Sequence, residues 1–169
     1  MMIPFLALMF FPLCMAYAAA SDLLTMRIPN LLSIALIAGF IPFALAAGMD
    51  AWTIFLHLAC ALMVLAGGFA LFAAGWIGGG DAKMAAAVAI WFGWGHLLEF
   101  LFLSSILGGG LTLLIVLWRR WPVPARLHGA EWIARLHEPK QGVPYGIAFA
   151  AAALHLYPAT PIWLRLLPP

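Results

Sequence analysis

The stretch that decides the fold class runs from Trp52 to Trp76 and reads WTIFLHLACALMVLAGGFALFAAGW. Its 25 residues include no Asp, Glu, Lys or Arg. A helix of about 20 mostly apolar residues is long enough to cross the hydrocarbon core of a bilayer. We therefore predict a transmembrane helix here.

The rest of the chain has the same apolar character. Of the 169 residues, 66% are hydrophobic and 8% are charged, whereas soluble domains carry about 25% charged residues. This composition predicts an all-α, polytopic integral membrane protein with one domain, residues 1–169, and excludes a large soluble domain. A net charge of +2 does not indicate nucleic acid binding. Cys14 and Cys60 lie singly in apolar runs, so we expect no disulfide, metal or cofactor.

Six candidate spans can be drawn, each bounded by charged residues, Gly or Pro. They are residues 3–20, 31–47, 52–76, 82–97, 100–118 and 143–157. Short turns are expected at residues 48–51 and at residues 95–99, where His96 and Glu99 are polar, and residues 158–169 are expected to form a tail. The first ends in small residues, as a signal peptide does, but no Lys or Arg precedes Arg27. We therefore interpret it as a transmembrane helix.

The positions of the cations predict the orientation of these spans, because short cytoplasmic loops are rich in Lys and Arg. In the six-span arrangement seven of the eight cations fall on one side, and only Arg165 falls on the other. We place both termini outside and the basic segments, including the loop 119–142, in the cytoplasm. Within that loop, residues 129–140 have the pattern of a short amphipathic helix. We favour a solvated segment that contacts anionic lipid over a surface that meets a partner or substrate.

Two acids are expected at the same membrane depth. Asp22 lies at the predicted cytoplasmic end of the first span, and Asp81 lies at the start of the fourth. A carboxylate close to hydrocarbon is costly and therefore points to function. Two facing carboxylates share a proton, so one can act as general base on water while the other polarises a carbonyl as general acid. Either Asp alone is explained more simply as a helix-end residue, with Asp81 capping its own helix.

The neighbours of the two acids admit two interpretations each. Gly78, Gly79 and Gly80 remove side chains before Asp81, which leaves room for a substrate backbone; the alternative is a flexible turn or close helix packing. Lys83 does not share a helical face with Asp81, and we favour an interfacial anchor. Arg27, in the sequence RIPN (27–30), is also interpreted as an anchor. Both cations are in addition candidates for binding the substrate or shaping the site.

Three motifs occur together: Asp22 followed by RIPN (27–30), GGGDAK (78–83) and GVPYGIAFA (142–150). In this order they resemble the type IV prepilin peptidase family of intramembrane aspartic proteases. The likeness is greatest to its short members that serve Flp/Tad pili, the CpaA/TadV type. The ordered set is far more specific than any one motif.

The resemblance implies an enzyme of the bacterial inner membrane that removes the leader of prepilins at the cytoplasmic face, by cleavage after a glycine. Asp22 and Asp81 match the two catalytic aspartates of the family, and Pro144 and Gly146 would shape the site. The implied partners are the prepilin substrate, membrane lipid and the pilus assembly machinery. In this family the members that also N-methylate the new N-terminus carry a cytoplasmic insert with paired cysteines. The present sequence has no such insert, so we expect cleavage without N-methylation.

Two other functions are compatible with the residues. Asp22 and Asp81 could relay protons or bind a cation in a small transporter or channel subunit, and a non-catalytic assembly factor would not need either acid. A transporter is expected to hold its acids near the bilayer midplane, whereas both acids here lie at span ends. Close approach of the two carboxylates would favour the protease.

Overall fold

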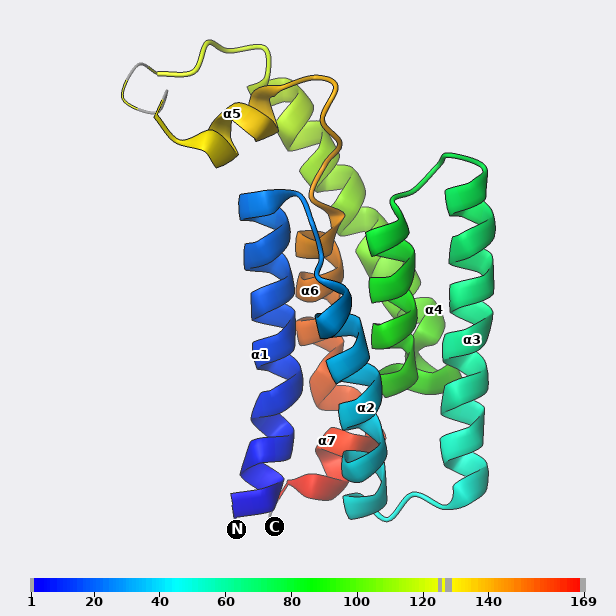
Figure 1. Ribbon diagram of the computed structural model, residues 1–169. Coiled ribbons are helices and arrows are strands. Elements are labelled where there is room, and N and C mark those ends of the chain that lie inside the picture. Colours follow the sequence, from blue (N-terminus) through cyan, green and yellow to red (C-terminus); the bar gives the residue numbers. More distant parts are fainter. Residues whose placement is uncertain (1, 125, 127–128, 168–169) are drawn as a thin grey trace.

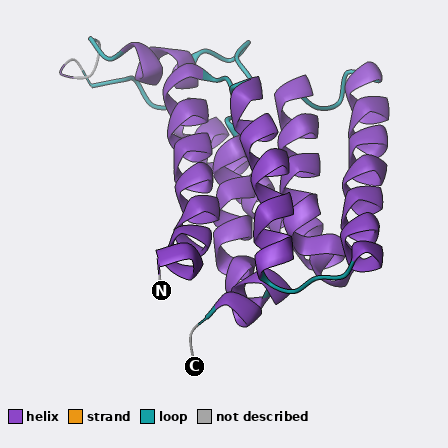
Figure 2. Cartoon of the chain, turned by 60° about the horizontal axis from the view of Figure 1, so that its bottom comes forward, coloured by secondary structure: helices purple, strands orange, loops and turns teal. Residues whose placement is uncertain are grey.

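In the computed structural model, every element of the described residues is a helix or a 3-10 turn (Figures 1 and 2). The structure describes residues 2–124, 126 and 129–167. The elements are α1 (Met2–Thr25), α2 (Asn30–Ala46), α3 (Ala51–Ala73), α4 (Gly79–Trp118), α5 (Glu131–His137), α6 (Tyr145–Leu156), the 3-10 turn η2 (Tyr157–Ala159) and α7 (Pro161–Leu166).

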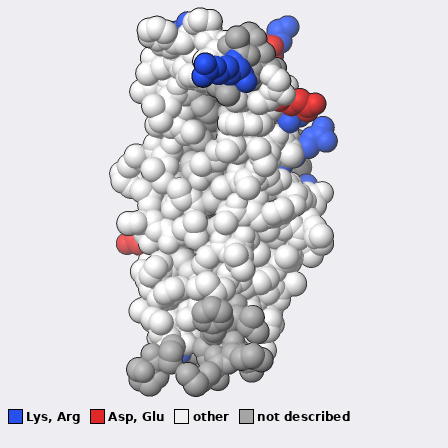
Figure 3. All heavy atoms as spheres, turned by 90° about the vertical axis from the view of Figure 1, so that its left-hand side faces the viewer, with Lys and Arg blue, Asp and Glu red and all other residues white. Residues whose placement is uncertain are grey.

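Three helices in the described part of the chain are long and apolar enough to cross a membrane. They contain the segments Leu8–Thr25 of α1, Ala51–Ala73 of α3 and Gly79–Trp118 of α4, and α2 is a shorter apolar helix. Most of the face shown in Figure 3 carries no charged residue. These features confirm the predicted all-α, polytopic membrane protein, and the number of spans remains a prediction.

The helix α4 reverses direction in its middle (Figure 1). Gly93 has φ 58° and ψ −167°, a conformation that residues with a side chain rarely adopt. The chain thus turns back between two helical limbs, as the predicted spans 82–97 and 100–118 require, but the predicted position of the turn, residues 95–99, is wrong. Residues 95–99 are helical, and the polar pair that suggested a turn is accommodated there, because His96 Nδ1 lies 3.0 Å from Glu99 Oε2.

His57 of α3 lies against this reversal. A Cβ at Gly93 would come within 2.7 Å of the imidazole ring. The ring Nδ1 lies 2.7 Å from the carbonyl oxygen of Ile90, one turn before the break. A buried carbonyl at a helix end needs a donor, so we assign His57 a structural role.

The first limb of α4, residues 79–92, is the centre of the bundle. Residues 84–92 are all buried, and Trp91 is fully buried and donates a hydrogen bond to the carbonyl oxygen of Leu36 at 3.1 Å. Five aromatic rings surround Trp91 with centroids 5.0 to 6.2 Å away. They belong to Phe10, Phe11, Phe40, Phe43 and Tyr157. This aromatic cluster lies toward the reversal, away from the start of α4.

The last predicted span differs from the structure in length. Its helix, α6, has 12 residues and is about 18 Å long, which is short for a hydrocarbon core of about 30 Å. The chain continues through η2 into α7, where sequence reasoning expected only a tail. Ile162 and Leu166 of α7 are buried, and Thr160 caps the helix by accepting a hydrogen bond from the Trp163 N–H at 3.3 Å.

We call the end of the bundle where α1 ends and α4 begins the aspartate end, because Asp22 and Asp81 lie there. Seven of the eight cations lie at this end, in the connections, in the first turns of α4 and in α5, and Arg165 lies in α7 at the opposite end (Figure 1). The seven are Arg27, Lys83, Arg119, Arg120, Arg126, Arg135 and Lys140. The fold therefore separates the charges as the spans predicted, while the side that faces the cytoplasm remains a prediction.

Candidate functional site

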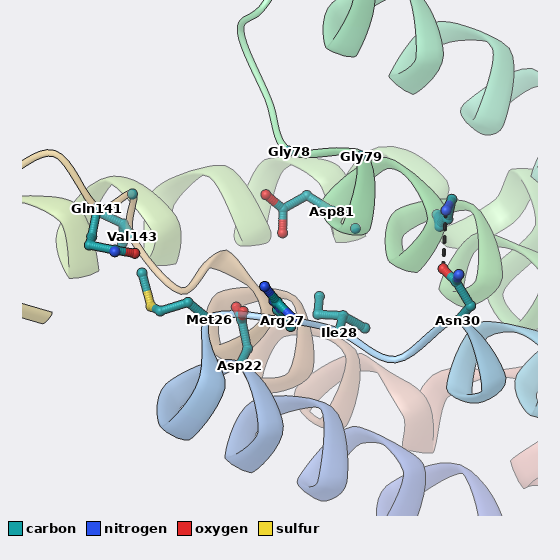
Figure 4. A pocket seen from close by; sticks show the side chains of 13 residues that line it. Asp22, Met26, Arg27, Ile28, Asn30, Gly78, Gly79, Asp81, Gln141 and Val143 are labelled. Atoms are coloured by element: carbon teal, nitrogen blue, oxygen red, sulfur yellow. Dashed lines mark hydrogen bonds between the residues drawn. The ribbon is translucent and has the colours of Figure 1, made fainter. Parts of the chain in front are cut away.

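A cavity of about 450 Å³ lies at the aspartate end. Its walls are the connection from α1 to α2, the start of α4 and the segment that leads into α6 (Figure 4). The lining residues are Asp22, Met26, Arg27, Ile28, Asn30, Gly78, Gly79, Gly80, Asp81, Lys83, Gln141, Gly142 and Val143. The cavity thus brings together all the predicted site residues except Pro144 and Gly146, which follow directly after one of its walls.

Asp22 lies in the last turn of α1 and is held by the first turn of α6. Its side chain is buried, with 5% exposed, and Oδ2 accepts a hydrogen bond from the Gly146 N–H at 2.7 Å. The first N–H groups of a helix have no partner within the helix, so they suit a carboxylate. Buried Pro144 comes directly before α6.

Glycine is required at position 146 by contact rather than by backbone conformation. A Cβ there would lie 2.8 Å from Oδ2 of Asp22, 3.0 Å from its Cβ and 3.1 Å from Cδ1 of Ile28. Gly146 therefore lets α6 approach close enough to donate to the carboxylate.

Asp81 lies in the first turn of α4, and its carboxylate accepts a hydrogen bond from the backbone of Gly78. This is the reciprocal half of a capping box, so Asp81 does cap its own helix. Its side chain also lies beside the cavity, across from Asp22 (Figure 4), close enough for the two charges to interact. Two carboxylates that approach each other closely can share a proton, which is the condition for combined general acid and general base chemistry.

The three glycines before Asp81 have different neighbours. A Cβ at Gly78 would lie 3.0 Å from Oδ2 of Asp81, and one at Gly79 would lie 3.3 Å from the ring of Phe72 on α3. Gly80 has looser surroundings, with Ile28 at 3.8 Å. Close packing thus explains Gly78 and Gly79, and all three residues line the cavity.

Lys83 and Arg27 line the same cavity. Lys83 Nζ donates to Oδ1 of Asn30 at 3.0 Å, which ties the start of α4 to the start of α2, a contact that the interpretation as an interfacial anchor does not include. Arg27 follows Met26, whose φ of 55° is the left-handed conformation that commonly ends a helix. The Arg27 carbonyl oxygen accepts a hydrogen bond from Oγ of Ser21 at 2.9 Å.

Sequence reasoning missed the part that the loop 119–142 plays in the cavity wall. Arg119 donates from Nε to the carbonyl oxygen of Leu136 at 2.7 Å, and from Nη2 to those of Gln141 and Gly142 at 3.1 Å each. A guanidinium has five N–H donors in a fixed plane and so can hold several carbonyls at once. No local pattern reveals these bonds, which span 17 to 23 residues.

The amphipathic stretch within this loop forms the helix α5, in which Ile133 and Leu136 are buried. Arg135 donates from Nη2 to the carbonyl oxygen of Leu24 at 2.8 Å. Leu24 lies in the last turn of α1, two residues after Asp22. The loop is therefore attached to the helix that carries Asp22, and the interpretation as a purely solvated segment does not describe it.

The family model described as the type IV leader peptidase family matches residues 9–113, which is more than half of the chain. The chain belongs to the type IV leader peptidase family. Membership implies a protease that acts on prepilins and confirms the resemblance drawn from the motifs. Comparison with the curated proteins and with the solved structures finds no match.

The match to the leader peptidases includes Asp22, RIPN (27–30) and Asp81 and ends before Arg119. Three features of the candidate site lie beyond it: the Arg119 contacts, the wall 141–143 and the Gly146 donor. These three features are therefore seen in the structure of this chain and not in the part that matches the family model.

Proposed function

We propose that this leader peptidase cuts Flp-type prepilins with an aspartate dyad, Asp22 and Asp81, and a water molecule. The observation that carries the proposal is the shared cavity. Two acids 59 positions apart, on different helices of an apolar bundle, line one open space at the end of that bundle. Carboxylates in such surroundings are costly and point to function.

In the proposed reaction one carboxylate is ionised and the other is protonated. The ionised member takes a proton from water as the water oxygen attacks the carbonyl carbon of the leader bond. The protonated member donates to the carbonyl oxygen, and the tetrahedral intermediate then loses the amine as the C–N bond breaks. The hydrogen bonds from Gly146 to Asp22 and from Gly78 to Asp81 orient the carboxylates for these transfers.

The location of the cavity suits an amphiphilic substrate. A basic leader belongs in water and the adjoining apolar helix belongs in the bilayer, so the bond between them lies at the membrane boundary. We propose that the aspartate end faces the cytoplasm of the bacterial inner membrane, because seven of eight cations lie at that end. Family membership does not favour a transporter.

Co-expression with a Flp-type prepilin tests the proposal. Asp22→Asn and Asp81→Asn should each abolish leader removal, measured by the mobility of the pilin on an immunoblot, at normal levels of the enzyme. Asp50→Asn is the control, because Asp50 caps α3 at the opposite end and Asn caps equally well. Full activity of either dyad variant would overturn the assignment.

The proposed absence of methyl transfer is tested in the same material. Mass spectrometry of the mature pilin should show an unmodified N-terminal amine. A methylated N-terminus that depends on this protein would contradict this part of the proposal.

A further inference from the structure

The Arg119 guanidinium holds two consecutive peptide units of the cavity wall in one orientation. A single nitrogen, Nη2, donates to the carbonyl oxygens of both Gln141 and Gly142 at 3.1 Å. Hydrogen bonds from a charged donor are stronger than those between neutral groups. By contrast, the adjacent Arg120 is exposed, and its side chain makes no hydrogen bond or ion pair within the described residues.

This orientation determines where the N–H groups of the same peptide units point. The described residues include no cis peptide bond, and in a trans peptide the C=O and the N–H point in opposite directions. The N–H groups of Gly142 and Val143 therefore both point away from Arg119. Neither has an acceptor among the described residues, and both residues line the cavity that contains Asp22 and Asp81.

We propose that the N–H groups of Gly142 and Val143 bind carbonyl oxygens of an extended substrate segment beside the scissile bond, and that Arg119 is the positioning residue that turns them toward it. This inference rests on the proposed function. Backbone N–H groups are strong donors that need acceptors. Recognition of an extended peptide through its main chain is a common binding mode, and it tolerates variation in the substrate side chains.

The remaining contacts of Arg119 support a positioning role. Its Nε bond to Leu136 fixes the end of α5, and Arg135 of α5 is bound to the last turn of α1. The wall that carries the two N–H groups is thereby attached to the helix that carries Asp22. A change at Arg119 should reach the substrate through the wall without removing a catalytic carboxylate.

A comparison of two substitutions at Gly142 tests the N–H directly. Proline removes the N–H and alanine keeps it, and a Cβ at Gly142 meets nothing within 4 Å. Both are made in the inactive Asp81→Asn background in lipid nanodiscs, and the Kd is measured for a synthetic prepilin peptide that spans the leader junction. The proline variant should bind about fivefold more weakly than the alanine variant, the effect of one lost hydrogen bond. Equal affinities would overturn the inference.

A comparison of Arg119→Lys with Arg120→Lys tests the positioning role. It also tests the role of the wall in substrate binding if the proline variant does not accumulate in the membrane. Both variants keep the positive charge that orients the protein, but an ammonium lacks the planar fork of donors. In the catalytically active enzyme Arg119→Lys should raise KM about fivefold with a smaller change in kcat, and Arg120→Lys should match the parent. Partial unfolding alone would lower the apparent kcat and leave KM unchanged, and that result would also refute the inference.

These outcomes are separate from failure of the proposed function. If the parent leaves prepilins uncut, or the Asp22→Asn variant cuts them, the proposed function fails. If the parent cuts them and the paired variants do not differ in affinity or KM, only the role of the wall fails.

Discussion

Alanine at position 146 is the smallest change that reaches Asp22, and it tests how closely that carboxylate must be held. The new Cβ would lie 2.8 Å from Oδ2 and 3.0 Å from Cβ of Asp22. Ordinary van der Waals contact begins near 3.4 Å, so the carboxylate or the start of α6 must move by roughly 0.6 Å. The Cβ of Asp22 cannot give way without a shift of α1, because it is attached to the helix backbone.

Two opposing terms determine the stability of the Gly146→Ala variant. Replacement of glycine by alanine within a helix stabilises it by up to about 1 kcal/mol, whereas overpacking of a filled site costs about 1 to 3 kcal/mol. We expect a net destabilisation of about 1 kcal/mol, which leaves the protein folded. Displacement of a reacting group by 1 Å can cost about 100-fold in rate, so the smaller shift here should lower kcat at least tenfold.

The assay for this variant is cleavage of a purified prepilin in detergent, with thermal unfolding of the same preparation. Gly109→Ala is the matched control, because Gly109 is a helical glycine on the exposed face of α4 with open space around it. It should cleave at the parent rate with unchanged or higher stability. If Gly146→Ala cleaves at the rate of Gly109→Ala, the carboxylate does not depend on the close approach of α6, and the reasoning is refuted.

Three further predictions concern the reversal, a cap and the orientation. Gly93→Ala should lower the melting temperature sharply, because the φ of 58° at Gly93 and its contact with the His57 imidazole both exclude a Cβ. Gly95→Ala is the control and should leave the melting temperature unchanged. Equal melting temperatures of the two variants would refute this. Hydrogen bonds from the first turn of α3 hold the pKa of the Asp50 carboxyl below its usual value. Asp50→Ala should therefore lower stability at neutral pH, and this difference should shrink as the pH falls below the usual pKa of an Asp carboxyl, about 3.9, and the group becomes protonated; a difference that persists undiminished in acid would contradict it. In a cysteine-free background, cysteines placed at Lys140 and Arg165 should react with an impermeant reagent from opposite sides of the membrane, and labelling from one side would refute the topology.

The location of both acids at one end of the bundle was predictable, because it follows from the apolar runs and from the distribution of cations along the sequence. Apolar runs give the limits of α1, α2 and α3 to within a few residues, apart from the last turn of α1. The division of cations between the two sides places Asp22 and Asp81 at one end. Each acid lies at the end of a predicted span, so the two are expected at the same depth in the membrane.

The reversal at Gly93 and the wall at 141–143 were not predictable in this way. A glycine within an apolar helical pattern does not reveal whether its φ is positive, and His96 and Glu99 suggested a turn in the wrong place. The contacts of Arg119 with Gln141 and Gly142 depend on how the connections fold over the end of the bundle. Neither feature has a periodic pattern, so only the three-dimensional arrangement shows them.

The position of the aromatic cluster has a consequence for mutational tolerance. Trp91 and its neighbours join α1, α2, α4 and η2 in one buried group, whereas the aspartate end is an open space rimmed by exposed side chains such as Arg27 and Lys83. Substitutions in the cluster should therefore reduce the amount of folded enzyme. Substitutions at the rim should change which peptides it accepts while the amount stays constant. A random mutagenesis screen can measure both the amount of folded enzyme and the peptides that it cleaves. Changes in amount should map to the part of α4 near Trp91, and changes in leader specificity should map to the first residues of α4.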